Sequence, residues 1–192
     1  MHEQLILASA SPRRKELLGL LNLEYSVVPS GVKEEFVPGL SVREHALGHS
    51  RSKALSVSVR FPQAWVLGAD TIVVVDGKPL GKPRNREEAR GMLRELSGKT
   101  HSVITGYAVA RDGRIAADGA VVSEVIFREI PDDEMEWYLS TGEPFDKAGG
   151  YAVQGASAFF IREIRGSYTN VIGLPLSEVA GVLKRLGVIR FG

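Results

Sequence analysis

Short apolar runs and helically spaced leucines alternate at the start of the chain. The apolar run 5–8 predicts a strand, and Ser11 followed by Pro12 suits the cap and first position of a helix. Leucines within 17–21 continue that helix, and the apolar segment 25–28 predicts a second strand. The pattern therefore predicts a strand, a turn, a helix and a strand in succession.

The middle of the chain continues this alternation. Ser41 and Glu44 form a capping box for a helix that runs toward Val59. The apolar segment 65–75 predicts a long buried strand, and Asp76-Gly77 is typical of a tight hairpin turn. A second helix and a first hairpin are therefore predicted here.

A third helix and a second hairpin follow. Asn85, with a glutamate three residues later, predicts a helix that ends at Gly98. Strands are predicted at 103–110 and 115–127, on either side of the Asp112-Gly113 turn. The remaining segments are predicted as a helix at 131–139, a turn-rich stretch at 142–151, a strand at 157–164 and a helix at 174–186 ended by Gly187. The sum is one α/β domain over 1–192, with a central mixed β-sheet flanked by helices.

Composition and charge narrow the functions that such a fold can serve. The 24 Lys and Arg residues balance 23 Asp and Glu residues to a net charge of +1, so there is no general positive field for nucleic acid. The absence of cysteine excludes disulfides, thiolate metal sites and cysteine nucleophiles. The longest uncharged stretch, 148–161, has 14 residues, fewer than the roughly 20 that cross a bilayer. Because the apolar run before Ser9 is also too short for a secretory leader, we expect a cytoplasmic protein that binds neither nucleic acid nor membrane.

Ser9, Ser11, Arg13 and Arg14 cluster where the first predicted strand leads into a helix. Free backbone N–H groups and the positive end of the helix dipole attract anions there, and guanidinium groups bind phosphate oxygens. The segment therefore predicts a phosphate site. A capped helix with two solvated arginines is the alternative interpretation.

Asp70, with Thr71 beside it, interrupts the apolar strand 65–75. A carboxylate among apolar residues loses hydration, so it persists with a partner, a metal or a catalytic role. We favour a catalytic role, and a structural aspartate that caps a neighbouring loop is the alternative. Lys82 follows the predicted hairpin, which could fold it back toward this carboxylate, although a solvated lysine fits the pattern as well.

Weaker candidates surround these residues. Glu34, Glu35 and Lys53 together would supply acidic metal ligands and a further phosphate contact. The segment 142–155 combines glycines, charges and an aromatic residue, which suits either a loop that approaches a ligand or an ordinary structural loop.

Several common motifs are absent from the sequence. His45 and His49 lie one helical turn apart, but the zinc-protease motif requires a glutamate directly after the first histidine, where Ala46 stands. We therefore interpret the two histidines as a solvated pair. The phosphate loop of common NTPases, the dinucleotide fingerprint in a strand-to-helix context and the esterase Gly-x-Ser-x-Gly motif are also missing.

The segments around these candidates are similar to those of the Maf family, the nucleoside triphosphate pyrophosphatases once described as septum-formation inhibitors. The similarity covers nearly the whole chain. Its motifs, in family order, are Ala8–Leu18, Gly68–Val73, Gly81-Lys82-Pro83, Leu96–His101, Asp146–Gly155 and Gly166–Tyr168 followed by Val171–Leu176.

This resemblance implies a mixed sheet, two lobes around a nucleotide cleft as in inosine triphosphate pyrophosphatases, and a homodimer. It implies hydrolysis of a nucleoside triphosphate to monophosphate and pyrophosphate with Mg²⁺ or Mn²⁺, in a house-cleaning or division-arrest role. Gly142–Gly149 followed by Gln154 is similar to the members that act on dTTP and UTP, whereas members that act on 7-methyl-GTP differ after the aspartate and carry a glutamate near the position of Gln154. The resemblance assigns Asp70 as proton acceptor, and Arg13, Thr71 and Gln154 to base choice.

The same resemblance suggests a role for each of the candidate site residues. We expect Asp70 to accept a proton from a water that attacks the α-phosphorus, with pyrophosphate leaving. Glu34 and Asp70 would hold the metal, although Lys33 stands where relatives can carry a second acidic residue. A primary amide at Gln154 matches the carbonyl and N3–H of thymine or uracil, while cytosine reverses that edge. The expected phosphate contacts are Ser9, Ser11, Arg13, Arg14, Lys53 and Lys82.

Two other functions fit these residues. A regulator of septum formation that binds dTTP or UTP without hydrolysis would use the same cations, but a desolvated Asp70 would repel its ligand unless a metal intervened. A pyrophosphatase for another base, such as 7-methyl-GTP, would keep the catalytic residues and change the base contacts.

Overall fold

The computed structural model describes residues 4–190, and the chain divides into two compact units. The first unit contains the residues up to Thr71, Thr105–Val121 and the residues from Gly173 onward. The second unit contains Ile72–Ile104 and Val122–Ile172. Residues 1–3, which begin the segment compared with a secretory leader, lie outside the described residues.

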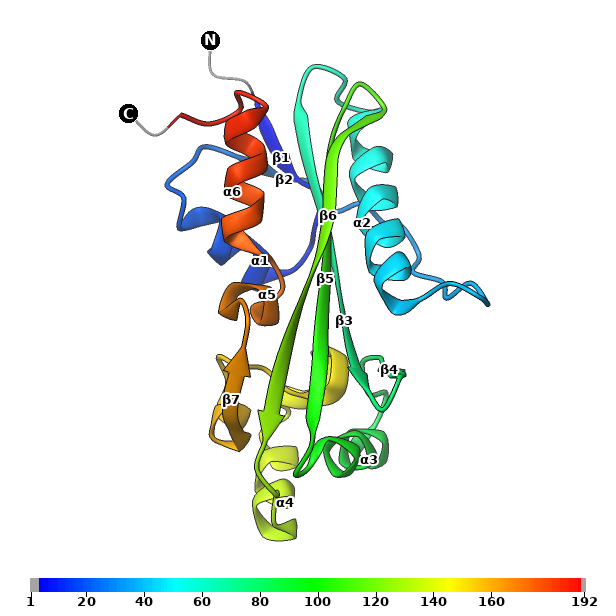
Figure 1. Cartoon of the computed structure of the whole chain (residues 1–192), viewed down its shortest axis with the longest axis vertical. Coiled ribbons are helices and arrows are strands. Elements are labelled where there is room, and N and C mark those ends of the chain that lie inside the picture. Colours follow the sequence, from blue (N-terminus) through cyan, green and yellow to red (C-terminus); the bar gives the residue numbers. More distant parts are fainter. Residues whose placement is uncertain (1–3, 191–192) are drawn as a thin grey trace. The chain divides into compact units, whose positions relative to one another are not determined.

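Within residues 4–190, the seven strands of the sheet follow the order β2-β1-β3-β5-β6-β7, and β4 pairs with β3 (Figure 1). They are β1 (Leu5–Leu7), β2 (Ser26–Val27), β3 (Trp65–Val75), β4 (Lys78–Leu80), β5 (Thr100–Arg111), β6 (Arg114–Phe127) and β7 (Ile161–Arg165). β1 pairs in parallel with β2 and β3, while β3 with β4 and β6 with β7 are antiparallel. The predicted mixed sheet is confirmed.

The first three helices begin directly after the predicted caps Ser11, Ser41 and Asn85. The helices are α1 (Pro12–Gly19), α2 (Val42–Ser58), α3 (Arg86–Leu96), α4 (Asp132–Ser140), α5 (Tyr168–Ile172) and α6 (Leu176–Arg185), with 3₁₀ turns η1 (Glu143–Asp146), η2 (Ala148–Gly150) and η3 (Ala156–Phe160). Ser41 Oγ accepts a hydrogen bond from the Glu44 backbone at 3.2 Å, and the Glu44 carboxylate accepts one from the Ser41 backbone at 2.7 Å, so the capping box is confirmed. None of the helices described in residues 4–190 is long and apolar enough to cross a membrane.

In the first unit, α2 packs closely against the sheet. Its residues Ala54 and Val57 share a buried cluster with side chains of β1, β3 and β5. A Cβ added at Gly68 of β3 would lie 2.4 Å from the Ser50 carbonyl oxygen, and one at Gly106 of β5 would lie 2.2 Å from that of Ala46. Only glycine permits this approach, which brings the small residues Ala46, Ser50 and Ala54 of α2 onto the two strands. Figure 1 shows α1 and α6 on the other side of these strands.

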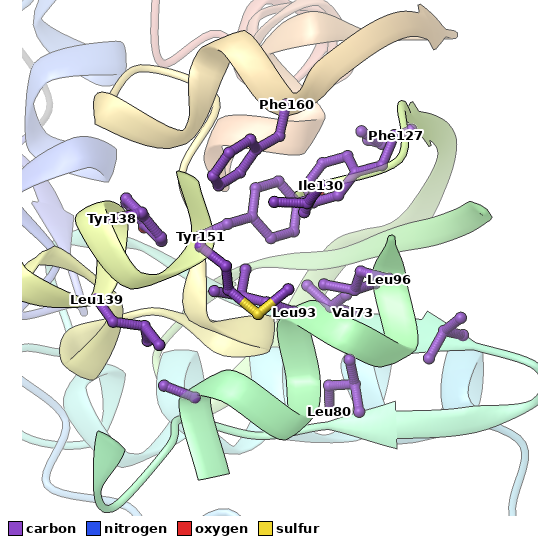
Figure 2. Close-up of a cluster of buried hydrophobic side chains, with 14 of the residues drawn as sticks. Val73, Leu80, Leu93, Leu96, Phe127, Ile130, Tyr138, Leu139, Tyr151 and Phe160 are labelled. Atoms are coloured by element: carbon purple, nitrogen blue, oxygen red, sulfur yellow. The ribbon is translucent and has the colours of Figure 1, made fainter. Parts of the chain in front are cut away.

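The second unit has its own aromatic core, shown in Figure 2. Val73, Leu93 and Phe127 pack there with Tyr138 and Phe160, on which α3, α4 and the 3₁₀ turns converge. Phe160 contributes to this core from the last residue of η3. The rings of Tyr138 and Phe160 meet edge to face with centroids 5.5 Å apart.

Two segments differ from the predicted elements. The predicted strand 157–164 begins as η3, and only its second half belongs to β7. Ser157 Oγ accepts from the Ala152 backbone N–H at 2.9 Å and donates to the Ala152 carbonyl at 3.0 Å, which holds the chain in a turn. The short helix α5 was not predicted; it depends on the buried amide of Asn170, which donates to the Val103 carbonyl at 3.0 Å.

Candidate active site

Asp70 lies on β3 in the first unit, and its residue is only 4% exposed. Apart from Thr71, its neighbours along the strand carry no polar side chain, and the carboxylate is taken out of water. The predicted partly desolvated carboxylate is therefore present, and it requires charged or hydrogen-bonding partners.

Two side chains of α2 supply those partners. Lys53 Nζ lies 2.8 Å from Asp70 Oδ1, and His49 Nδ1 lies 3.0 Å from Asp70 Oδ2. Burial alone would raise the pKa of the Asp70 carboxyl, but the Lys53 ammonium, the Arg14 charge and the His49 hydrogen bond outweigh it and hold that pKa below its usual value. Asp70 is therefore a carboxylate at neutral pH.

Lys53 connects Asp70 to the predicted acidic segment. Its ammonium lies 2.5 Å from a carboxylate oxygen of Glu34 and 3.4 Å from the carbonyl oxygen of Ala69. The capping box sets the register of α2, and residues four apart lie on one helix face, so His49 and Lys53 both reach β3. One buried ammonium thus bridges two carboxylates.

Arg14 holds three separate segments of the first unit together. Its Nε donates to the Gly173 carbonyl at 2.8 Å, Nη2 to Thr71 Oγ1 at 2.9 Å, and Nη1 to Ser9 Oγ at 3.3 Å. Burial lowers the pKa of the Arg14 guanidinium, while the Asp70 and Glu34 carboxylates counteract this; arginine still remains protonated. Arg14 is therefore engaged by protein groups rather than solvated.

The other polar groups of this cluster are ordered by the same segments. Thr71 Oγ1 lies 3.0 Å from Thr105 Oγ1 on β5. The Ser11 backbone N–H donates to Ser9 Oγ at 3.2 Å, and the Ser11 side chain makes no capping bond to α1. Arg13 is half-buried in the first turn of α1. Contacts and charge interactions within the first unit thus connect Ser9, Arg14, Glu34, Lys53, Asp70 and Thr71, and Ser11 and Arg13 belong to the same segment as Ser9 and Arg14.

Two predicted site residues, Lys82 and Gln154, belong to the second unit and are exposed. Gln154 stands between η2 and η3, in a segment closed by Glu143, whose carboxylate accepts from the Ala156 backbone N–H at 2.8 Å. Lys147 Nζ donates to the Glu143 carbonyl at 2.7 Å. Lys147 and Glu143 therefore bind backbone groups within or directly next to the segment 142–155, and these bonds fix its shape.

The interpretation of His45 and His49 as a solvated pair is wrong. The residues are 5% and 9% exposed. His49 Nε2 lies 3.0 Å from the backbone carbonyl oxygen of Glu35, while Nδ1 faces Asp70. The spacing of the two histidines does not indicate the Asp70 carboxylate opposite His49, because Asp70 lies 21 residues further along the chain. The useful signal was the four-residue spacing between His49 and Lys53 on one helix.

Few side chains in this cluster could bind a metal ion. Within the described residues, no group of three or more His, Cys, Asp or Glu side chains could hold a metal ion. Glu34 and Asp70 provide two carboxylates, and both contact the Lys53 ammonium. Mg²⁺ is commonly held by one or two carboxylates together with substrate phosphates and waters, so this pair suits a metal that arrives with a nucleotide.

Solved structures and sequence relatives define the class of this protein. A HAM1 protein from Coxiella burnetii has the same fold, with a TM-score of 0.53 and 17% identity over 95% of this chain and 99% of that one. The model of the family described as Maf-like protein matches residues 4–186, and the chain belongs to the Maf family.

Relatives in that family are much closer in sequence. The dTTP/UTP pyrophosphatase of Syntrophus aciditrophicus is 55% identical over 98% of this chain and 93% of its own length. That of Pyrococcus horikoshii is 52% identical over 94% of this chain and 95% of its own length.

Proposed function

We propose that this protein is a nucleoside triphosphate pyrophosphatase that hydrolyses dTTP and UTP to the monophosphate and pyrophosphate. The observation that carries the proposal is a buried, ionised Asp70 beside the cations Lys53 and Arg14, in a chain 55% identical to a dTTP/UTP pyrophosphatase. A carboxylate held ionised in a site that attracts anions is suited to activate water beside a phosphate.

The reaction needs a base, and Asp70 suits that role. Lys53 and His49 each occupy one lone pair of its two oxygens, and a carboxylate has about four such acceptor positions. A water bound to a remaining position would lose its proton to Asp70 while its oxygen attacks the α-phosphorus. The bond from that phosphorus to the bridging oxygen then breaks, and pyrophosphate leaves with the electron pair.

The negative charge that develops on the phosphates needs cations. Lys53 lies beside the carboxylate, and Arg13 stands at the N-terminal turn of α1, where backbone N–H groups also face outward. Three of the five N–H donors of Arg14 bind protein groups, so a direct phosphate contact would use the other donors of the guanidinium. Ser9, Ser11 and Lys82 complete the proposed phosphate contacts.

A divalent cation, Mg²⁺ or Mn²⁺, fits the two carboxylates of the cluster. Glu34 and Asp70 would hold it, in competition with Lys53, which contacts both. Such an ion would neutralise phosphate charge and lower the pKa of a bound water.

Base choice is proposed to involve Arg13, Thr71 and Gln154. The Thr71 hydroxyl is oriented by Arg14 and Thr105, so it presents a fixed polar group. The exposed Gln154 amide offers the donor and acceptor that thymine and uracil match. This pattern favours dTTP and UTP over 7-methyl-GTP. The expected homodimer and cytoplasmic location are part of the same proposal.

Product analysis tests the activity directly. We expect pyrophosphate and monophosphate, without orthophosphate, when dTTP or UTP is supplied with Mg²⁺ or Mn²⁺. Asp70→Asn keeps the shape but removes the base, so kcat should fall by about 10²–10⁴-fold with little change in nucleotide binding. Asp112→Asn is the matched control because it makes the same chemical change at an exposed turn with φ of 50°. Nucleotide binding without products would instead identify a sensor.

A further inference from the structure

His49 joins Asp70 to the segment that carries Glu34. Its ring lies between two oxygen acceptors: Asp70 Oδ2 is 3.0 Å from Nδ1, and the carbonyl oxygen of Glu35 is 3.0 Å from Nε2. A carbonyl and a carboxylate accept hydrogen bonds and do not donate them, so each ring nitrogen donates where both bonds are made. The imidazole thereby connects β3 with residue 35, next to Glu34.

The segment needs such a connection because its backbone is irregular. Residues 28–41 contain no helix or strand. Aromatic contacts assist at the same place: the Phe36 ring centroid lies 4.6 Å from that of His45 and 5.9 Å from that of His49. Residues 34–36 are therefore positioned by side chains of α2, and two of these side chains, His49 and Lys53, also contact Asp70.

We infer that His49 is a positioning residue that orients the Asp70 carboxylate and fixes the Glu34 segment beside it; this inference rests on the proposed pyrophosphatase activity. Asp70 Oδ1 is held by Lys53, which also binds Glu34 and can be drawn toward the phosphates. His49 holds the other oxygen through a ring that is itself fixed at Glu35. The Asp70 carboxylate then keeps its orientation when Lys53 binds the substrate. A general base needs such a fixed orientation to accept a proton from the attacking water.

Packing alone does not explain this arrangement. An apolar side chain at position 49 could fill the space and contact Phe36, but it would leave Asp70 Oδ2 and the Glu35 carbonyl without these donors. His45 provides the internal comparison, because it is buried one turn earlier and stacks on the same Phe36 ring. The two histidines thus allow packing to be separated from hydrogen bonding.

Three variants test the inference by steady-state kinetics with dTTP and Mg²⁺. We expect His49→Leu to lower kcat by about tenfold or more while KM changes by less than about threefold, because a misplaced base slows the chemistry. His49→Asn, whose amide can donate from near the position of Nδ1, should recover kcat to within about threefold of wild type. His45→Leu, the matched control, should keep kcat within about threefold.

The outcomes separate the two proposals. A wild-type enzyme that releases no pyrophosphate from any nucleotide overturns the proposed function. An active wild type with unchanged kcat in His49→Leu, or with His49→Asn as slow as His49→Leu, overturns only the role of His49.

A measurement without substrate covers the case in which His49→Leu does not fold. Histidine-selective ¹⁵N spectra of ligand-free wild type and Asp70→Asn should show shifted ring resonances for His49 and unchanged ones for His101. Unchanged His49 resonances in the Asp70→Asn variant would overturn the inference.

Discussion

The two units bury a histidine in opposite ways. His49 in the first unit lies between a carboxylate and a carbonyl, within a network that includes Lys53 and Arg14. His101 in the second unit donates to or accepts from the Tyr151 hydroxyl at 2.6 Å, and its ring meets that of Phe127 edge to face at 4.9 Å. Burial lowers the pKa of His101 to about 4, so that ring is neutral at physiological pH.

Burial by itself therefore does not indicate that a histidine has a functional role. The aromatic surroundings of His101 provide no negative charge, so a neutral ring is the stable form and serves packing. The surroundings of His49 contain buried charges, and these groups stay ionised because opposite charges lie next to them. The groups that contact each histidine therefore distinguish the charged cluster around Asp70 from the aromatic core of the second unit.

The largest effect is expected from removing the cation that compensates Asp70. Lys53→Met keeps the side-chain length but leaves two carboxylates without their shared ammonium. Loss of one partner of a buried pair costs about 3–5 kcal/mol, and urea unfolding at pH 7 should show a loss of that order.

The pH dependence of that loss checks its cause. In wild type the pKa of Asp70 is depressed, so its contribution to stability is present above the ordinary aspartate pKa and lost as pH falls through the depressed value. The deficit of Lys53→Met should therefore shrink in acid. A deficit that is constant with pH would point to packing instead.

A somewhat smaller effect is expected from the helix–strand contact beneath the charged cluster. Gly68→Ala places a methyl group 2.4 Å from the Ser50 carbonyl and 2.7 Å from the Ala54 nitrogen, so α2 must move. We expect a loss of about 2–3 kcal/mol in unfolding free energy and reduced activity, because His49 and Lys53 move with the helix. Gly48→Ala on the same helix is the control; its methyl meets nothing within 4 Å, and it should stabilise by about 0.5–1 kcal/mol.

The smallest of these effects belongs to the second unit. The unfolded chain protonates His101 below its ordinary pKa of 6.5, whereas the folded protein does so only near 4. Stability attributable to His101 is therefore lost as pH falls from 6.5 toward 4, by about 2 kcal/mol at pH 5. His101→Gln, which retains a partner for Tyr151, should reduce the loss of unfolding free energy between pH 7 and pH 5 by that amount. An equal pH dependence in both proteins would refute this assignment.

Much of the fold followed from local signals in the sequence. The capping box at Ser41 and the Asp-Gly turns have short-range causes: Asp76 and Gly77 both adopt positive φ, of 48° and 77°, as a tight hairpin requires. The 3₁₀ turn η3 and helix α5 could not be predicted in this way. Asn170 in α5 bonds to Val103, 67 residues away, and Ser157 in η3 bonds to Ala152, five residues earlier, which is outside the usual cap and turn patterns.

The residues of the charged cluster could be found in the sequence by two local signals. Asp70 interrupts an apolar strand, and the arginines after β1 stand where a strand leads into a helix. His49 was missed because its partners lie 21 and 14 residues away in the sequence, and no local pattern connects them. The catalytic, phosphate, metal and base-choice roles of the site residues, Lys82 and Gln154 included, remain predictions.

The Arg14 contacts also bear on how the protein is made. The bond from Arg14 to the Gly173 carbonyl spans 159 residues, so it is among the contacts with the highest loop-closure cost. During synthesis, Arg14 therefore lacks this acceptor until residue 173 has been translated. The Ser9–Arg14 segment is made much earlier than its Gly173 partner, so the Arg14 hydrogen-bond network is completed late in folding.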